Sequence, residues 1–209
     1  MSRPAHIGQE EGADWDTRLV LPEWEMLPDI GLYMDQVITL MERTFSPALP
    51  KGEITKSMVN NYVKVELIPR PVGKKYDREH LALLMMIGVL KQALSMESIA
   101  GMLALLCAQG VQSGYTRFVR EVDQLEQALE QGRVDLSIGR DSPQEKAMHA
   151  GVTAAVCTIS ANRLLARARR DADEARQGGE IRDAREHEAR RIRHIYRRAH
   201  GGRAFPGGI

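Results

Sequence analysis

Polar side chains between residues 54 and 76 have the types and spacing that could bind a polyanion. Apolar residues recur at helical spacing over residues 56–65, and the opposite face of that helix carries lysine, serine and asparagine. Amides can hydrogen-bond the edge of adenine, while ammonium groups can bind phosphate or guanine. The pattern therefore predicts a DNA-binding site made of Lys56, Ser57, Asn60, Asn61, Tyr62, Lys64, Lys74, Lys75 and Tyr76.

The surrounding sequence indicates how these residues would be presented. Thr55 is a suitable N-cap for the helix over 56–65, and two prolines and a glycine then end it and impose a turn. On this frame Asn60 and Asn61 are the candidates for base contacts, and the lysines at either end would hold phosphates. The alternative is an ordinary three-helix unit whose polar face meets only water and whose two tyrosines bury their rings.

Several short motifs here resemble those of MerR-type regulators, which bind DNA through a winged helix-turn-helix. Asn60-Asn61-Tyr62 stands where those proteins carry Arg-Tyr-Tyr, Glu66-Leu67-Ile68-Pro69 stands at their Gly-Leu-Ile/Leu-x-Pro exit, and Lys74-Lys75-Tyr76 stands at their Arg-x-Tyr wing. Asp77-Arg78-Glu79-His80-Leu81 and Ser95-Met96-Glu97-Ser98-Ile99 resemble the starts of the next two helices. Over residues 21–106 the chain is similar to a bacterial family known only as a domain of unknown function with a MerR-like head.

This resemblance implies a head with a small wing, in which Tyr62 and Tyr76 also help to hold phosphate. The chain departs from the motif at Asn60, where the family has arginine, and at Glu66, where it has glycine. These two differences favour an alternative function, a non-enzymatic protein–protein interaction module that uses the same head.

Periodicity along the chain predicts an all-α fold. Helices are expected at 32–43, 56–65, 78–93, 96–107, 115–131 and 143–170, followed by an interruption at Gly178-Gly179 and a charged helix over 180–200. The small residues of 143–170 favour tight helix packing or a dimer seam. We therefore expect a disordered tail over 1–20, a DNA-binding head over 21–107, a helical dimerisation or effector region over 115–170, and a charged, partly helical or mobile tail over 171–209.

The net charge of +1 hides an uneven distribution. Residues 1–49 contain three basic and nine acidic residues, a balance of −6; residues 51–91 contain eight and four, a balance of +4; residues 163–203 contain thirteen and seven, a balance of +6. The arginine-rich tail could be a second nucleic-acid contact or a solvated helix with internal pairs such as Glu186 with Arg190. Its interleaved acids favour the solvated helix.

Other classes of function find little support. Cys107 and Cys157 lie in apolar helical stretches, which are more typical of buried thiols than of a disulfide or a metal-sensing pair. His187 and His194 have no further ligands beside them, so we expect no metal and no cofactor. No catalytic motif is present, which argues against an enzyme. There is no leader and no apolar run of about 20 residues, so we expect no membrane partner.

These observations predict a cytoplasmic bacterial DNA-binding transcription regulator. Its expected partners are double-stranded DNA, a second copy of the chain in a homodimer, and an unidentified effector.

Overall fold

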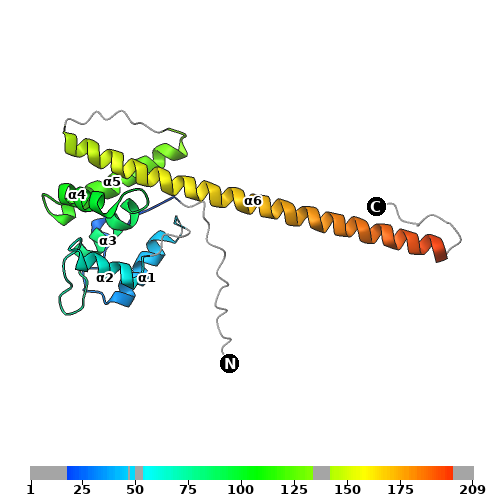
Figure 1. Ribbon diagram of the computed structural model, residues 1–209, viewed down its shortest axis with the longest axis horizontal. Coiled ribbons are helices and arrows are strands. Elements are labelled where there is room, and N and C mark those ends of the chain that lie inside the picture. The colour runs from blue at the N-terminus through cyan, green and yellow to red at the C-terminus, as the bar shows by residue number, and fades with distance from the viewer. Residues whose placement is uncertain (1–17, 47, 50–53, 134–141, 200–209) are drawn as a thin grey trace, which may run out of the picture. The chain divides into compact units, whose positions relative to one another are not determined.

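The computed structural model describes residues 18–46, 48–49, 54–133 and 142–199, and the regular secondary structure in these ranges is helical (Figure 1). The predicted all-α fold is confirmed. The tail expected over residues 1–20 lies outside the described residues up to position 17, but Leu19 is buried in the core. In chain order the elements are η1 Trp24–Met26, α1 Met34–Phe45, α2 Lys56–Lys64, α3 Arg78–Leu90, α4 Met96–Leu106, α5 Val111–Glu130 and α6 Pro143–Ala199.

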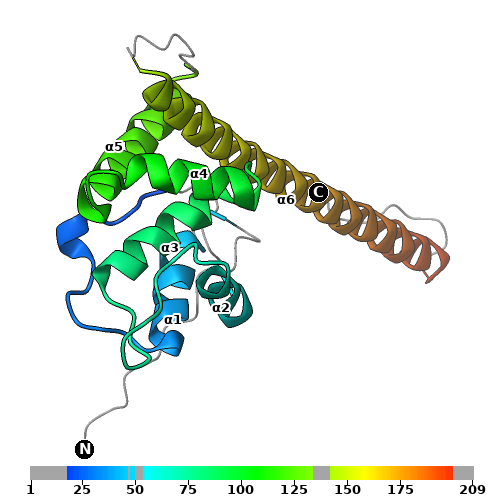
Figure 2. The ribbon, with the colours of Figure 1, turned by 60° about the vertical axis from the view of Figure 1, so that its left-hand side comes forward.

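Helix α3 is the centre of the fold, because every side chain from His80 to Leu90 is buried. Asp77 caps its first turn, where the carboxylate accepts a hydrogen bond of 3.2 Å from the His80 amide. Helix α3 packs against α4 and α5. Gly88 lets α1 come close, since a Cβ at this position would lie 2.6 Å from the Phe45 ring. Figure 2 shows α1 and α2 on one side of α3 and α4 on the other.

Helix α5 begins earlier than the sequence predicts. Residues 110–114 are expected to form a loop, but the residues after Gly110 make the first turn of α5. The reason is Gly114, whose lack of a side chain lets this turn lie against the end of α4. A Cβ on Gly114 would be 2.5 Å from the Leu106 carbonyl oxygen. This glycine, which reads as a loop residue, is used for close helix packing.

One hydrophobic core joins the predicted head to the helices that follow it. Phe118 of α5 and Ile159 of α6 belong to the same buried cluster as the apolar residues of α1–α4. The Tyr115 hydroxyl also donates a hydrogen bond of 2.8 Å to the Pro22 carbonyl. The core therefore crosses the boundary that the sequence predicts between residues 107 and 115. The described residues up to Leu165 form one compact unit, and those from Ala166 form a second.

Helix α6 continues through Gly178 and Gly179, so the predicted interruption there is wrong. A glycine in a helix costs about 1 kcal/mol relative to alanine, which weakens a long helix without ending it. Near its start, Gly151 faces the core, where a Cβ would lie 2.6 Å from the Met102 Cε. Ala154 and Ala161 are exposed. Some small residues thus serve packing within this chain, and the dimer seam stays a prediction.

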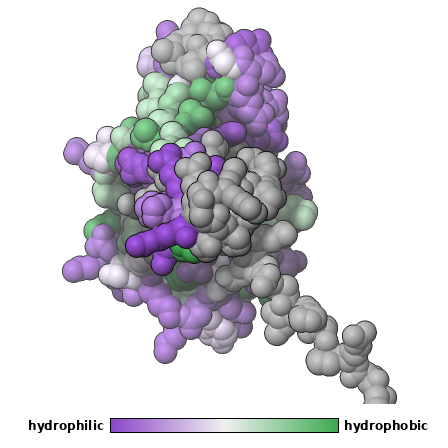
Figure 3. Space-filling view, turned by 90° about the vertical axis from the view of Figure 1, so that its right-hand side faces the viewer, coloured by the Kyte–Doolittle hydropathy of each residue, from purple (hydrophilic) through white to green (hydrophobic). Residues whose placement is uncertain are grey.

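In the described part of the chain, no helix combines the length and the apolar character needed to cross a membrane. Most of the described surface that Figure 3 presents is hydrophilic. Apolar side chains on that face are limited to a smaller area.

Candidate nucleic-acid interface

Helix α2 separates its apolar and polar side chains onto two faces. Val59 and Tyr62 are buried, which fixes the inward side of the helix. Successive residues of an α-helix are rotated by about 100° around its axis. Positions 56, 57, 60, 61 and 64 therefore lie together on the other side of the helix. The exposed residues of that side are Lys56, Ser57, Asn60, Asn61 and Lys64. Five of the six α2 residues of the predicted site, all except Tyr62, therefore share one solvent-facing surface.

Both ends of α2 are held by specific hydrogen bonds. At the start, the Thr55 hydroxyl accepts a bond of 3.3 Å from the Met58 amide, as predicted for an N-cap. At the end, the Glu66 amide donates to the Val63 carbonyl at 3.2 Å and the Leu67 amide donates to the Tyr62 carbonyl at 2.9 Å. This pair of bonds is a Schellman motif. Its left-handed position, usually glycine, is occupied by Glu66 with φ +57°.

A tight hairpin follows α2 and carries the second basic group. The Lys75 amide donates a bond of 3.0 Å to the Val72 carbonyl, and Gly73 and Lys74 between them have φ of +57° and +64°. Positive φ at both central residues is the signature of a type I′ turn, which suits the twist of a hairpin. The backbones of Tyr76 and Leu32 then exchange two hydrogen bonds of 2.8 Å, which fix the hairpin beside the start of α1.

The four lysines of the predicted site differ in their surroundings. Lys56 forms an ion pair with Asp35 of α1, in which both side chains remain more than half exposed. The Lys75 ammonium lies 5.4 Å from the centre of the Tyr33 ring, a cation–π contact. Lys64 and Lys74 are exposed and have no ion-pair partner among the described residues. The last two are therefore the cations most available to an external anion.

The two tyrosines of the predicted site are buried. The exposed fraction is 3% for Tyr62 and 4% for Tyr76. Burial raises the pKa of both phenols, and the Tyr76 ring meets the His80 ring edge-on with centres 5.4 Å apart. This corrects the expectation that both residues hold phosphate: their rings stabilise the core under α2 and the hairpin. The alternative role foreseen for these tyrosines is the one that the structure supports.

Arg70 is an exposed basic residue that the predicted site omits. It stands between Pro69 and Pro71 on the segment that joins α2 to the hairpin. A residue that precedes proline is restricted to extended backbone, so this segment holds its side chain outside any helix. The Pro-Arg-Pro sequence is the signal that could have identified it.

Comparison with known proteins adds one finding to this geometry. Residues 22–124 match the family model described as domain of unknown function, DUF1836. No curated protein and no solved structure matches the chain. The DUF1836 match confirms the predicted likeness to a domain of unknown function. It also extends past residue 106 into α5, in agreement with a core that includes α5.

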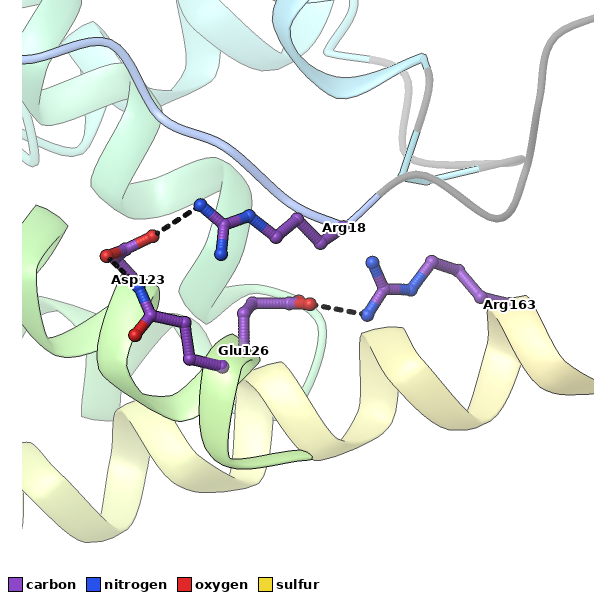
Figure 4. A network of polar contacts seen from close by, with 5 residues as sticks. Arg18, Asp123, Glu126 and Arg163 are labelled. Carbon is purple, nitrogen blue, oxygen red and sulfur yellow. Dashed lines mark hydrogen bonds and ion pairs between the residues drawn. The ribbon is translucent and has the colours of Figure 1, made fainter. Parts of the chain in front are cut away.

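A second polar group, absent from the predicted site, links α5 to α6 (Figure 4). The Arg163 guanidinium donates a bond of 2.6 Å to Glu126, whose side chain is almost fully buried. Burial raises the pKa of Glu126, and the opposing effect of Arg163 is smaller. Nearby, Arg18 lies 3.1 Å from Asp123. The arrangement fixes one helix against the other, because a buried carboxylate without its cation would be strongly destabilising.

No group of three or more histidine, cysteine, aspartate or glutamate side chains in the described part of the chain is placed to hold a metal ion. Cys107 and Cys157 are free thiols, both half-buried. Burial raises the pKa of Cys107, which lowers its reactivity as a thiolate.

Proposed function

We propose that this protein binds double-stranded DNA through the exposed face of α2 and the hairpin over residues 72–75, as a transcription regulator with a MerR-like winged helix-turn-helix. The observation that carries the proposal is the composition of that face. Along nine residues of α2, the exposed side chains offer amide, hydroxyl and ammonium donors and no carboxylate. Such a face matches the acceptors on phosphates and base edges.

Each part of the surface has a separate role in this proposal. Helix α2 would enter the major groove, where Asn60 and Asn61 can each donate and accept hydrogen bonds at an adenine edge. Lys64, Lys74 and Arg70 would contact phosphates on either side and fix the register of α2 without reading sequence. The hairpin acts as the wing. Its type I′ turn places Lys74 at the tip, on backbone held in a defined conformation.

The regulator would act as a homodimer in the cytoplasm, with no catalytic role for this domain. Two copies would meet half-sites about one helical turn, or about 34 Å, apart. An effector would then act through the helices that follow α4.

Specific observations also favour a second candidate, a module that binds another protein with the same face. Two of the four lysines already have partners inside the domain, Asp35 and the Tyr33 ring. Val72 at the hairpin tip is 83% exposed, and Val65 at the end of α2 is more than half exposed. Apolar side chains of this kind suit the centre of a protein interface more than a phosphate contact.

The two candidates are separated by fluorescence anisotropy of the full chain on a labelled mixed-sequence duplex and on its own upstream region, across a salt series. DNA binding predicts that log affinity falls linearly with log salt, with a slope of about 0.9 for each phosphate contact. Lys64→Gln/Lys74→Gln should therefore reduce the slope by about two. The matched control is Arg120→Gln/Lys146→Gln, which changes the net charge equally at exposed positions outside the site.

Asn60→Ala/Asn61→Ala tests base reading in the same assay. It should leave the salt slope unchanged and reduce the preference for a specific site, by about 1–3 kcal/mol for each bidentate pair of hydrogen bonds that the substitution removes. Equal slopes in the lysine variant and its control, or no binding to either duplex at low salt, would count against DNA and in favour of the protein-binding module.

A further inference from the structure

The charges of α6 are sorted along its length. From residue 167 to residue 188, every arginine has an acidic residue within four positions along the chain. From residue 189 to residue 199 there is no acidic residue at all. We call residues 189–199 the basic segment. It contains Arg190, Arg191, Arg193, His194, Arg197 and Arg198.

Ion pairing within the helix accounts for only the start of the basic segment. Arg190 lies 3.3 Å from Glu186 and Arg191 lies 4.0 Å from Glu188, and the side chains of both pairs are well exposed. Such exposed pairs contribute about 0.2–1 kcal/mol and leave the guanidinium free to exchange partners. Arg193 and Arg198 have no acid within four positions on either side, so i,i+4 pairing with an acidic side chain is not open to them.

The helix dipole explains part of this arrangement. Cations in the last turn of a helix are stabilising, by about 0.3–1 kcal/mol each, and the effect fades within one turn. The basic segment covers three turns, since eleven residues at 3.6 per turn span that length. Arginines in its first two turns are thus beyond the reach of this effect. Their accumulation without counter-charges needs another explanation.

The geometry of the segment suits a row of phosphates. Arg190 and Arg193 stand three positions apart, and Arg191 and Arg198 stand seven apart, which places each pair along one side of the helix. All five cations of fixed charge are arginine and none is lysine, and the planar guanidinium fork can bind a phosphate through two parallel hydrogen bonds. Arg190, Arg191, Arg193 and Arg198 are all exposed.

A lipid surface is a poorer match for the same charges. A helix that lies on a membrane needs a broad apolar face in addition to its cations. Among the residues of the basic segment whose side chains the structure describes, the exposed large apolar ones are Ile192 and Ile195. Two isoleucines among five arginines give little apolar area to bury, so the charge has to provide the binding.

We propose that the basic segment is a second DNA-binding surface, which holds the phosphate backbone of a duplex without reading its sequence. It is distant in sequence from α2 and the hairpin, and the proposal does not depend on their function. Binding at this surface exchanges condensed counterions for guanidinium groups, so its affinity depends steeply on salt.

The test uses the full chain and a labelled duplex DNA of mixed sequence in a salt series. The variant R190Q/R191Q/R193Q/R198Q should lose about 3.6 units from the slope of log affinity against log salt, since each of four phosphate contacts supplies about 0.9. The matched control R167Q/R169Q/R170Q/R176Q removes the same charge from arginines of α6 that each have an acidic residue within four positions. It should retain most of the slope. Circular dichroism on both variants confirms that the helix is kept.

Two further arms make the result decisive. Vesicles containing phosphatidylserine should bind the wild-type chain and the variant equally weakly. A slope that is equal in the variant and the control would overturn the proposal, as would a loss of vesicle binding with an unchanged slope on DNA. Lys64→Gln/Lys74→Gln in the same assay separates the two surfaces. If only the lysine variant reduces the slope, the proposed role of the basic segment alone is overturned. If only the arginine variant reduces the slope, the proposed role of α2 alone is overturned.

Discussion

Glu66 stands where a Schellman motif is best served by glycine, and its replacement should stabilise the protein. Its φ of +57° lies in the left-handed region, where an L-residue with a Cβ is disfavoured by roughly 1–2 kcal/mol. Glycine removes that cost but makes the unfolded chain more flexible, which opposes folding by about 0.4–1 kcal/mol. The net expectation for Glu66→Gly is a gain of about 0.5–1 kcal/mol in the free energy of unfolding.

Urea unfolding followed by tryptophan fluorescence measures this gain. Trp24 reports on the correct part of the chain, because its ring packs against the buried Tyr115 ring with centres 6.3 Å apart. For a domain of this size the gain corresponds to a rise of about 2–3 °C in the melting temperature. Because Glu66 is exposed, the loss of its charge should have little effect of its own.

Two variants show whether the backbone is the cause. Glu66→Ala removes the charge but keeps the Cβ, so it should stay within about 0.5 kcal/mol of the wild type. Gly73→Ala introduces a Cβ at the same φ of +57° in open space, so it should cost about 1 kcal/mol through the backbone alone. A gain in Glu66→Ala as large as in Glu66→Gly would refute the reasoning, because charge and not conformation would then be responsible.

Two other predictions concern the packing of the first compact unit. Gly88→Ala should lower the free energy of unfolding by about 1–3 kcal/mol, because its Cβ would lie 2.6 Å from the Phe45 ring; a normal value by urea unfolding would contradict the close approach of α1 and α3. Because of Glu126, the free energy of unfolding should fall as the pH rises. Burial raises its pKa above the ordinary 4.5, so the folded state holds the proton more tightly than the unfolded chain in the window just above that value. Glu126→Gln should flatten this fall in urea titrations between about pH 4.5 and pH 7, and an unchanged slope would contradict it.

Local signals in the sequence predict the starts of α2, α3 and α4, because each start depends on the side chain of one capping residue. Thr55, Asp77 and Ser95 all accept the capping hydrogen bond expected of them. The polar face of α2 is also predictable, because the spacing of Val59 and Tyr62 decides which side of the helix faces the core. The candidate site is predictable to the extent that it lies on one helix and one turn.

The features that the sequence did not predict depend on partners far along the chain. Gly114 reads as a turn until the end of α4 lies against it. Glu126 reads as a solvent-exposed residue of an amphipathic helix, and only Arg163, 37 residues later, makes its burial tolerable. Tyr62 and Tyr76 carry polar tips, so the sequence fits either a phosphate contact or a core position, and only the complete fold shows that both are buried. These contacts join residues that are far apart in the chain, so no regular spacing in a single sequence predicts them.

The two departures at α2 have a consequence for how tightly the proposed regulator could bind. An amide at position 60 in place of a guanidinium supplies no counterion release, and Glu66 adds a carboxylate just after α2. With Lys64, Lys74 and Arg70 as the available cations, one copy would make about three phosphate contacts. Duplex-binding proteins with 6–10 such contacts lose about 10³–10⁵ in affinity between 50 mM and 200 mM salt, so three contacts alone give weak and mildly salt-dependent binding.

A homodimer doubles the number of phosphate contacts, and the basic segment of α6 would add about four contacts for each copy. The salt slope of the wild-type chain therefore distinguishes these arrangements. At about 0.9 for each contact, it should be about 2.7 for the α2 surface alone, about 5.4 for its dimer, and well above 5.4 where the basic segment also binds the same duplex.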